Sequence, residues 1–179
     1  MTAAEYDIVR WYVMRAHKCE ARAEEKLAEA GIEFYIPKNW VVRVFHGKKT
    51  KRLVPVIPDL IFVKASHRTI ADFKIANNYL QFVIWNRKDG QEYVTVPDNQ
   101  MEDFIRVSSD PNADAMYLAP GEINIKKGTR VRIIGGELDG VCGAFMKVRG
   151  KRNKRLVVLL DGVLAVSAEV QPDLIEVIE

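Results

Sequence analysis

The residues of this chain best suited to chemistry are two clusters of Lys and Arg, and the chemistry that they suit is contact with phosphate. Between Lys38 and Arg52 there are six Lys or Arg residues and no Asp or Glu. Between Lys147 and Arg155 there are again six and no acid. Because the whole chain has a net charge of only +3, both clusters are local features. Such clusters are typical of phosphate-binding surfaces, although two solvated hairpin ends would carry the same residues.

Residues that could bind metals or act as nucleophiles are scattered. The histidines, His17, His46 and His67, lack ligand spacing, and no Ser/His/Asp or Cys/His pattern is present. Cys19 and Cys142 lie outside any CxxC pair, which favours half-buried free thiols over a disulfide, a zinc site or a catalytic thiol. The glycines include no GxxxxGK[ST] loop. The sequence therefore favours a protein that is not an enzyme and has no cofactor or metal.

The compartment follows from the same features. Unpaired cysteines fit a reducing cytoplasm. No stretch approaches the roughly 18 apolar residues of a membrane helix. The first residues carry acids before their apolar part, so we expect neither a secretory signal nor a membrane partner.

The stretch "RLVPVIPDLIFV" (residues 52–63) is almost wholly apolar yet carries two prolines. Alternate residues of a strand face opposite sides, so Leu60 and Phe62 would face one way and Ile61 and Val63 the other. One set can pack under helices. The other is either core of a two-layer domain, which the pattern alone favours, or an apolar patch of the kind that marks a partner site. The second proline predicts an edge or a bend.

The elements that must position these residues alternate in the order β-α-β-β-α-β-β-α up to residue 107. In chain order, we expect strands and helices at residues 9–14 (strand), 19–30 (helix), 33–45 and 52–63 (strands), 66–77 (helix), 80–85 and 92–96 (strands) and 97–107 (helix). Residues 46–51 are polar and contain Gly, which predicts a hairpin tip. This order is typical of a small α+β domain with a largely antiparallel sheet.

After residue 107 the pattern changes. Residues 108–122 are rich in Ser, Asp, Asn and Pro and predict a linker. Five short strands with turn-rich spacing fill residues 123–179, which predicts a small closed barrel. Asp161-Gly162, between two apolar runs, predicts one of its hairpins. Dense Val and frequent Gly favour this all-β structure over helices.

Two motifs resemble the NusG family of transcription elongation factors. The first is "WYVM" (Trp11–Met14) with "VIPDLIFV" (Val56–Val63), which resembles the family's WYV opening and FPGYVFV strand. The second is "KKGTRVRIIGGELDGVCGAFMKV" (Lys126–Val148), which is similar to the KOW motif: a strand, a Gly-rich turn and the pair Gly140 and Gly143. The two motifs occur in the family's order over nearly the whole chain.

The chain departs from the family in its first motif. Where the family core usually reads Phe-Pro-Gly-Tyr, this sequence has Ile57-Pro58-Asp59-Leu60. The departure indicates a specialised paralogue of the antiterminator type, for which UpxY-like proteins are the most similar pattern. No HTTT-like run is present, so the contact of that subgroup with the polymerase gate loop is not carried over.

The resemblance implies a NusG-type sheet with helices over residues 1–107, then the linker and a KOW barrel of SH3-like form at residues 123–179. It also implies a regulator that binds RNA polymerase and suppresses pausing or termination. The surface expected to meet the clamp helices of RNA polymerase consists of Val13, Ile57, Pro58, Leu60 and Phe62, with Phe104 and Ile105 at its rim.

The resemblance also implies partners for the basic hairpin and for the barrel. Contact with non-template DNA near the transcription bubble is expected from Lys48, Lys49, Lys51 and Arg52. The barrel would recruit a ribosomal protein or a termination factor. The alternative is an RNA-binding KOW module of ribosomal or RNA-processing type, in which the tip Lys147–Arg155 would hold RNA phosphates.

Overall fold

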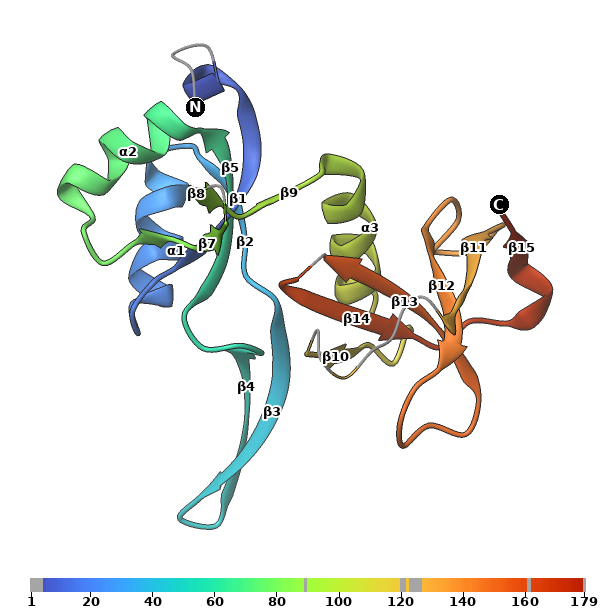
Figure 1. Cartoon of the computed structure of the whole chain (residues 1–179). Coiled ribbons are helices and arrows are strands. Elements are labelled where there is room, and N and C mark those ends of the chain that lie inside the picture. Colours follow the sequence, from blue (N-terminus) through green and yellow to red (C-terminus); the bar gives the residue numbers. More distant parts are fainter. Residues whose placement is uncertain (1–4, 89, 120–121, 123–126, 161, 179) are drawn as a thin grey trace. The chain divides into compact units, whose positions relative to one another are not determined.

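The computed structural model describes residues 5–88, 90–119, 122, 127–160 and 162–178. It divides into two compact units, Met1–Pro97 and Asp98–Glu179. The mixture of helices and antiparallel strands confirms the α+β class (Figure 1). Residues 120–121 of the expected linker and 123–126 at the expected start of the barrel lie outside the described residues.

A five-stranded antiparallel sheet forms the centre of the first unit. A short 3-10 turn, Glu5–Asp7, precedes its first strand, and all its described pairings are antiparallel. In spatial order the strands are β2 (Glu33–Tyr35), β5 (Leu60–Ser66), β1 (Val9–Arg15) and β6 (Gln81–Phe82), with β9 (Thr95–Val96) also paired to β1.

Two helices, α1 (Glu20–Glu29) and α2 (His67–Ala76), cover one face of this sheet (Figure 1). One end of each helix lies at a residue of a type that favours helix ends, Ser66 for α2 and Gly31 for α1. The hydroxyl of Ser66 accepts a hydrogen bond of 3.1 Å from the backbone N–H of Thr69, which caps α2. Gly31, just after α1, has φ = 65°, a conformation that glycine adopts at little cost.

The core of the first unit lies between the sheet and these helices. Ile61 and Val63 of β5 pack there with Leu27 of α1 and Ile70 of α2, and all four side chains are buried. Burying each of them stabilises the fold by about 1.5–3 kcal/mol, which holds both helices on this face. The expected alternation of β5 is therefore confirmed on its helix-covered side.

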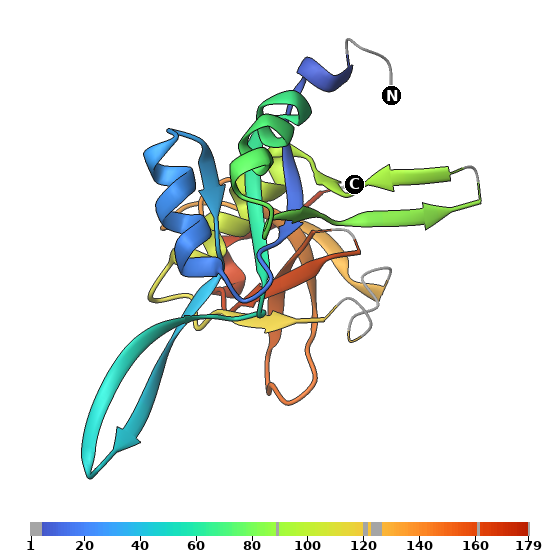
Figure 2. The same ribbon diagram turned by 90° about the vertical axis from the view of Figure 1, so that its left-hand side faces the viewer.

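A two-stranded hairpin, here called the arm, extends away from the sheet of the first unit (Figure 2). It consists of β3 (Lys38–Phe45) and β4 (Lys48–Pro55), joined by the two-residue turn His46–Gly47. Both turn residues have positive φ, 47° and 76°. This is the type I′ arrangement, whose twist matches that of a two-stranded ribbon. The predicted hairpin tip is confirmed, and it is shorter than expected.

Four strands predicted as continuous runs are interrupted in the structure. Residues 33–45 divide at Pro37, which has no N–H to donate to a ladder. Residues 52–63 divide in the turn that contains Pro58, which confirms the predicted bend. Residues 80–85 divide at Val83 and residues 92–96 divide at Val94. These divisions separate a second hairpin, β7 (Ile84–Arg87) and β8 (Gly90–Tyr93), from the sheet.

The second unit contains the helix α3 (Asp98–Ser109) and one antiparallel sheet. A 3-10 turn, Pro172–Leu174, precedes the last strand. The sheet order is β10 (Met116–Leu118), β14 (Leu164–Ala168), β13 (Lys154–Leu160), β12 (Cys142–Lys147), β11 (Thr129–Ile133) and β15 (Ile175–Val177). The five predicted strands are confirmed as β11 to β15. This all-β sheet domain is consistent with a KOW domain.

The boundary between the units differs from the expected one at residue 107. Helix α3 packs against β13 and β14. Its Asp103 carboxylate accepts a hydrogen bond of 3.1 Å from the backbone N–H of Cys142, and Arg106 donates one of 3.0 Å to the carbonyl of Glu137. Contacts therefore assign α3 to the second unit. The expected linker also contains β10, which pairs with β14 through Tyr117 and Val166.

Candidate functional site

The face of the first unit's sheet opposite α1 and α2, here called the second face, carries two of the residues expected to meet a partner, Val13 and Phe62. Strands β1 and β5 place Val13 directly opposite Phe62, and β2 places Tyr35 on the other side of Phe62. Because Ile61 and Val63 point to the helices, Phe62 points to the opposite face. Val13 is 1% exposed and Phe62 is 0% exposed. The structure therefore brings these two residues together and buries both.

The turn that leads into β5 carries three more of the expected residues. Ile57 is half-buried, Pro58 is exposed and Leu60 is buried. Leu60 lies opposite Arg15 of β1, whose side chain is exposed. The accessible part of the expected surface is thus the turn that contains Ile57 and Pro58. This turn leads into Leu60, which lies opposite the exposed Arg15.

Asp59 holds this turn in an unusual conformation. Its φ is 67°, in the left-handed region where glycine stands in the pattern that the sequence resembles. The backbone N–H of Asp59 donates a hydrogen bond of 2.7 Å to Glu20, and its carbonyl accepts one of 2.8 Å from Ala16. Its carboxylate accepts a hydrogen bond from the backbone N–H of Lys18. These bonds fasten the turn to the segment that leads into α1.

The remaining two expected residues, Phe104 and Ile105, lie on α3 in the second unit. Phe104 is buried, with its ring centroid 6.2 Å from that of Tyr117 in β10. Ile105 is half-buried. Phe104 is thus packed among residues of the second unit.

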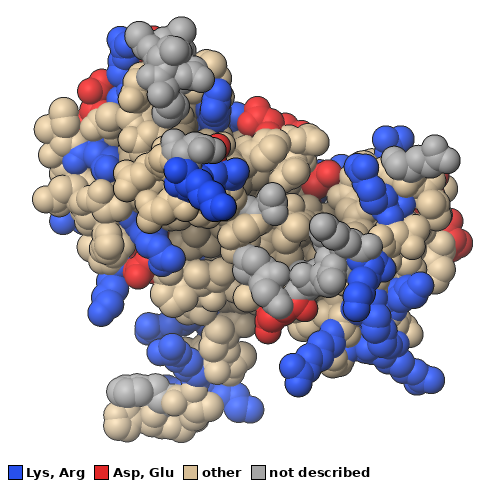
Figure 3. All heavy atoms as spheres, viewed as in Figure 1, with Lys and Arg blue, Asp and Glu red and all other residues tan. Residues whose placement is uncertain are grey.

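The arm carries the first basic cluster. The four expected nucleic-acid-binding residues all lie on β4 and are all exposed: Lys48, Lys49, Lys51 and Arg52. Figure 3 shows Lys and Arg atoms gathered along the arm. Lys38 at its base is paired with Glu24 of α1, at 2.6 Å between Nζ and Oε2. The structure therefore leaves the cations of β4 at the surface, where phosphate contact requires them.

The arm also carries apolar side chains that the sequence analysis did not single out. Trp40, Val42 and Val44 alternate along β3 and lie on one face, with Leu53 of β4 opposite Trp40. These four are between 47% and 64% exposed. In the sequence, residues 40–45 are apolar except for Arg43, so the row of exposed side chains along one face is not evident from residue type.

Four of the six cations of the second basic cluster are exposed, but one is buried, which corrects the RNA-gripping alternative at that residue. Arg155 is 1% exposed, and its Nη1 lies 3.0 Å from the carboxylate of Asp114. It also donates hydrogen bonds to the hydroxyl and carbonyl of Ser167, at 3.2 and 3.3 Å. Lys151 is bound to the same carboxylate at 2.7 Å. Buried Arg155 serves the fold of the second unit and cannot hold RNA phosphate.

This network also changes the titration of Asp114. Hydrogen bonds from Lys151 and then Arg155 lower the pKa of the Asp114 carboxyl below its ordinary value. The carboxylate is therefore charged over a wide pH range and keeps its two cations in place. The sequence analysis missed Asp114 because its partner is 41 residues away in the chain.

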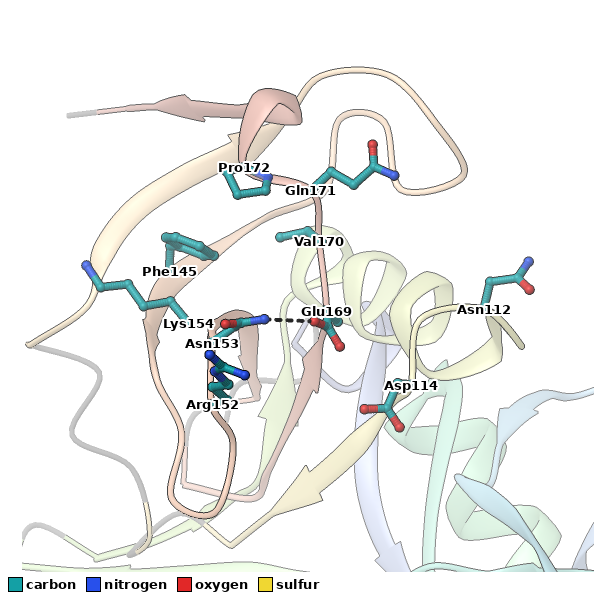
Figure 4. A pocket seen from close by; sticks show the side chains of 10 residues that line it. All are labelled: Asn112, Asp114, Phe145, Arg152, Asn153, Lys154, Glu169, Val170, Gln171 and Pro172. Atoms are coloured by element: carbon teal, nitrogen blue, oxygen red, sulfur yellow. Dashed lines mark hydrogen bonds between the residues drawn. The ribbon is translucent and has the colours of Figure 1, made fainter.

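A hollow of about 740 Å³ lies beside this network in the second unit (Figure 4). Arg152 and Lys154 supply positive charge, Glu169 supplies negative charge, and Phe145 and Pro172 supply apolar surface. Asn153 donates a hydrogen bond of 3.3 Å to Glu169 across it. Among the lining residues that the structure describes there is no Ser, Cys or His that could act as a nucleophile or base. The mixed lining suits binding of a polar partner.

Other titratable residues form an aromatic cluster in the first unit. The imidazole of His67 stacks on Phe82 at 4.8 Å between ring centroids, and Tyr12 and Tyr93 lie against the same pair. Burial, and then the nearby charge of Lys74, lower the pKa of His67. Within the described part of the chain, no group of three or more His, Cys, Asp or Glu side chains could hold a metal ion. The rings pack around the imidazole of His67, and burial favours its neutral form.

The two cysteines are unpaired thiols. Cys19 and Cys142 are both half-buried, as the sequence predicted. In the residues that the structure describes, no helix is long and apolar enough to cross a membrane.

Comparisons with known proteins identify one family. A family model described as "NusG: Transcription termination factor nusG" matches residues 9–105, which is more than half of the 179 residues. No curated protein matches the chain. A solved structure titled "Domain interaction in Thermotoga maritima NusG" is similar with 18% identity and a TM-score of 0.45, over 96% of this chain and 98% of that one.

Proposed function

The chain belongs to the NusG family, and we propose that it is a transcription elongation regulator that binds RNA polymerase and suppresses pausing or termination. The observation that carries the proposal is the family match over residues 9–105. That range contains the whole five-stranded sheet, the arm and the turn around Asp59. Such a regulator would act in the cytoplasm, without a cofactor and without catalysing a reaction.

The proposed polymerase-binding surface is the second face of the sheet and the turn that leads into it. Its residues are Val13, Ile57, Pro58, Leu60 and Phe62, and its partner would be the clamp helices of the polymerase. An apolar sheet face next to an exposed turn fits an amphipathic helix. Since Val13 and Phe62 are buried, the polymerase helix would first meet Ile57 and Pro58. The place of Phe104 and Ile105 at the rim of this surface stays a prediction.

The basic strand of the arm, β4, is proposed to contact the DNA backbone near the transcription bubble. Lys48, Lys49, Lys51 and Arg52 are exposed on one strand of a hairpin that extends away from the sheet. Phosphate contacts of this kind position a protein without reading bases. They would add to the weak apolar contact on the polymerase.

The second unit is proposed to recruit another protein, either a ribosomal protein or a termination factor. The hollow lined by Phe145, Arg152, Lys154 and Glu169 offers both charge signs and apolar surface for such contact. Two weakly binding units on one chain gain effective concentration from each other. The partner would thereby be tethered to the polymerase.

We further propose that the chain is a specialised, UpxY-like paralogue that acts on selected operons. The support is the sequence of the turn, where Asp59 adopts the left-handed conformation in place of glycine. The carboxylate of Asp59 binds the segment before α1, so this substitution is integrated into the fold.

Binding of full-length variants to purified RNA polymerase tests the proposed surface. Ile57→Asp places a charge on the half-buried turn and should weaken binding at least about tenfold, because burying an unpaired carboxylate at an apolar contact is costly. Ile75→Asp is the matched control, since Ile75 is 83% exposed on α2. Circular dichroism should show that both variants are folded. Equal binding by a folded Ile57→Asp variant and the unsubstituted chain would contradict the surface.

A further inference from the structure

We infer that the apolar and basic face of the arm is a stacking platform for an unpaired nucleic-acid strand, with Trp40 as the residue that stacks on a base. This inference rests on the proposed function for its biological setting and specifies which nucleic acid the arm takes and how. It goes beyond phosphate contact, because stacking requires an exposed base. The platform consists of Trp40, Val42, Val44, Lys49, Lys51 and Leu53.

The register of the arm places these six side chains on one face. Trp40 lies opposite Leu53, Val42 opposite Lys51, and Val44 opposite Lys49. Because side chains of directly opposed residues in an antiparallel pair share a face, apolar groups and cations lie next to each other along it. Lys51 Nζ lies 4.9 Å from the centroid of the Trp40 ring. A cation therefore lies over the ring on which a base would stack.

The exposure of this face is unusual for a structural hairpin. Trp40 is 61% exposed, Val42 59% and Val44 64%. Apolar side chains scattered singly over a surface need no explanation, but a row of them along one ribbon face marks a binding site. Among the strands that the structure describes, the two strands of the arm pair only with each other.

Charge selects the kind of partner. Residues 38–55 contain Lys and Arg but no Asp or Glu, so the face attracts an anionic partner along its whole length. Nucleic acid meets this requirement with one phosphate per nucleotide. It also offers a π-face at each base for the indole, and proteins that bind single strands combine a cationic track with aromatic platforms in this way. In a duplex the bases are stacked on each other and are not available to Trp40.

The spacing of the platform is regular. Side chains two residues apart on a strand are separated by roughly 6.6 Å, so successive rungs of the ribbon can meet successive units of an extended chain. Val42 and Val44 would then support the sugars or bases next to the one on Trp40, while Lys49 and Lys51 hold the phosphates. This arrangement binds without strong sequence preference, since every base has a stacking face.

The test is a titration of fluorescein-labelled oligonucleotides with the full-length chain. Binding is measured by fluorescence anisotropy at several salt concentrations. The probes are unpaired oligo-dT, unpaired oligo-rU and a duplex of the same length. We expect both unpaired probes to bind more tightly than the duplex. Trp40→Ala should weaken their binding at least about fivefold, whereas Trp40→Phe should retain most of it, because phenylalanine keeps a ring. The DNA and RNA probes distinguish the two sources of an unpaired strand.

Matched variants separate stacking from charge. Trp85→Ala removes a tryptophan that also lies beside a cation, with Arg87 5.2 Å from its ring, but on the other hairpin. It should leave binding unchanged. Replacing Lys49 and Lys51 by Gln should lower the slope of log affinity against log salt by about 1.4, from two lost phosphate contacts on a single strand. Oligonucleotide quenching of tryptophan fluorescence should be lost in Trp40→Phe and kept in Trp85→Phe.

Two results would overturn the inference. One is an affinity of Trp40→Ala within twofold of the unsubstituted chain, and the other is a duplex bound as tightly as the single strands. Either would show that the arm contacts phosphate only or binds an acidic protein. If the Trp40 variants fail in this way while Ile57→Asp still weakens polymerase binding, only this inference falls. If Trp40-dependent binding persists but the chain does not bind polymerase, the proposed function falls instead.

Discussion

At Asp59 the chain departs from the family pattern, which has glycine there, and its backbone adopts a conformation that favours glycine. A non-glycine residue at φ = 67° is strained, although Asp tolerates this region better than most residues. The strain is offset by its carboxylate, which accepts a hydrogen bond from the backbone of Lys18, and by its N–H, which donates to Glu20. The side chain therefore stabilises a conformation that the glycine of the family pattern adopts freely.

Asp59→Ala should lower the free energy of unfolding by about 1–3 kcal/mol. It keeps a strained Cβ and loses a hydrogen bond to a charged group. Asp59→Asn should cost less, because the amide oxygen can still accept from Lys18 and Asn also tolerates positive φ. Urea unfolding of both variants measures the difference. Equal stability of Asp59→Ala and the unsubstituted chain would show that the carboxylate does not hold the turn.

His67 gives the first unit a defined response to pH. Burial and the charge of Lys74 lower its pKa below the ordinary value of 6.5, so the unfolded chain binds the proton more strongly than the folded chain. The contribution of His67 to stability is therefore complete above about pH 6.5 and is lost as the pH falls through the lower pKa of the folded state. In the described part of the chain, its buried Nε2 has no hydrogen-bond partner.

We expect stability to fall between pH 7.5 and 5 by a component that is absent in His67→Phe, which preserves the stack on Phe82. NMR titration of the His67 ring protons gives the pKa directly, and urea unfolding at both pH values gives the stability. A ring pKa at or above 6.5 would contradict the explanation.

At the level of helices and strands, local signals in the sequence predicted most elements of the fold. A helix was expected over residues 66–77, and Ser66 caps it through Thr69. The basic run between two extended segments was expected to be a hairpin and forms the arm. These predictions succeed because caps and turns depend on residues a few positions apart.

The elements that the sequence did not predict depend on distant partners. Strand β10 is only Met116–Leu118 inside a stretch with linker composition, and it exists because β14 pairs with it. A helix over residues 97–107 was predicted, but its packing against β13 and β14 was not, since the sequence pattern of a helix does not say which sheet it meets. The four exposed apolar residues on one face of the arm were also missed, because residue type alone does not tell whether a side chain is exposed.

The attachment of β10 provides a prediction for the second unit. Asp114→Asn should lower the stability of this unit by about 1–2 kcal/mol at pH 7, because buried Arg155 loses the nearer of its two carboxylates. It keeps Glu169 at 3.8 Å and its bonds to Ser167. Since the pKa of Asp114 is lowered, the effect is present above about pH 3.8 and disappears as the pH falls through the lower pKa of the folded state. Scanning calorimetry at pH 7 and in acid measures both.

Lys151→Ala is the control for this prediction. It removes the other cation on Asp114 but leaves Arg155 paired, and a partly exposed pair contributes about 0–1 kcal/mol. A larger loss from Lys151→Ala than from Asp114→Asn would show that the surface pair, and not the buried guanidinium, secures β10.

At the scale of the whole molecule, the chain combines two compact units with different surfaces. The first carries a buried apolar pair on the second face of its sheet, an exposed turn and a cationic arm. The second offers a hollow with charged and apolar lining, in which the described residues include no Ser, Cys or His. Their combination on one chain is compatible with the proposed regulator, in which two weakly binding units gain effective concentration from each other.

The most direct test of this account is a single-round transcription assay with purified RNA polymerase, with and without the full-length chain, on templates that carry a pause and a terminator. The chain should be retained on the elongation complex and should increase read-through, and Ile57→Asp should do neither while Ile75→Asp does both. No binding to the elongation complex and unchanged read-through, with a folded chain in excess, would contradict the central claim.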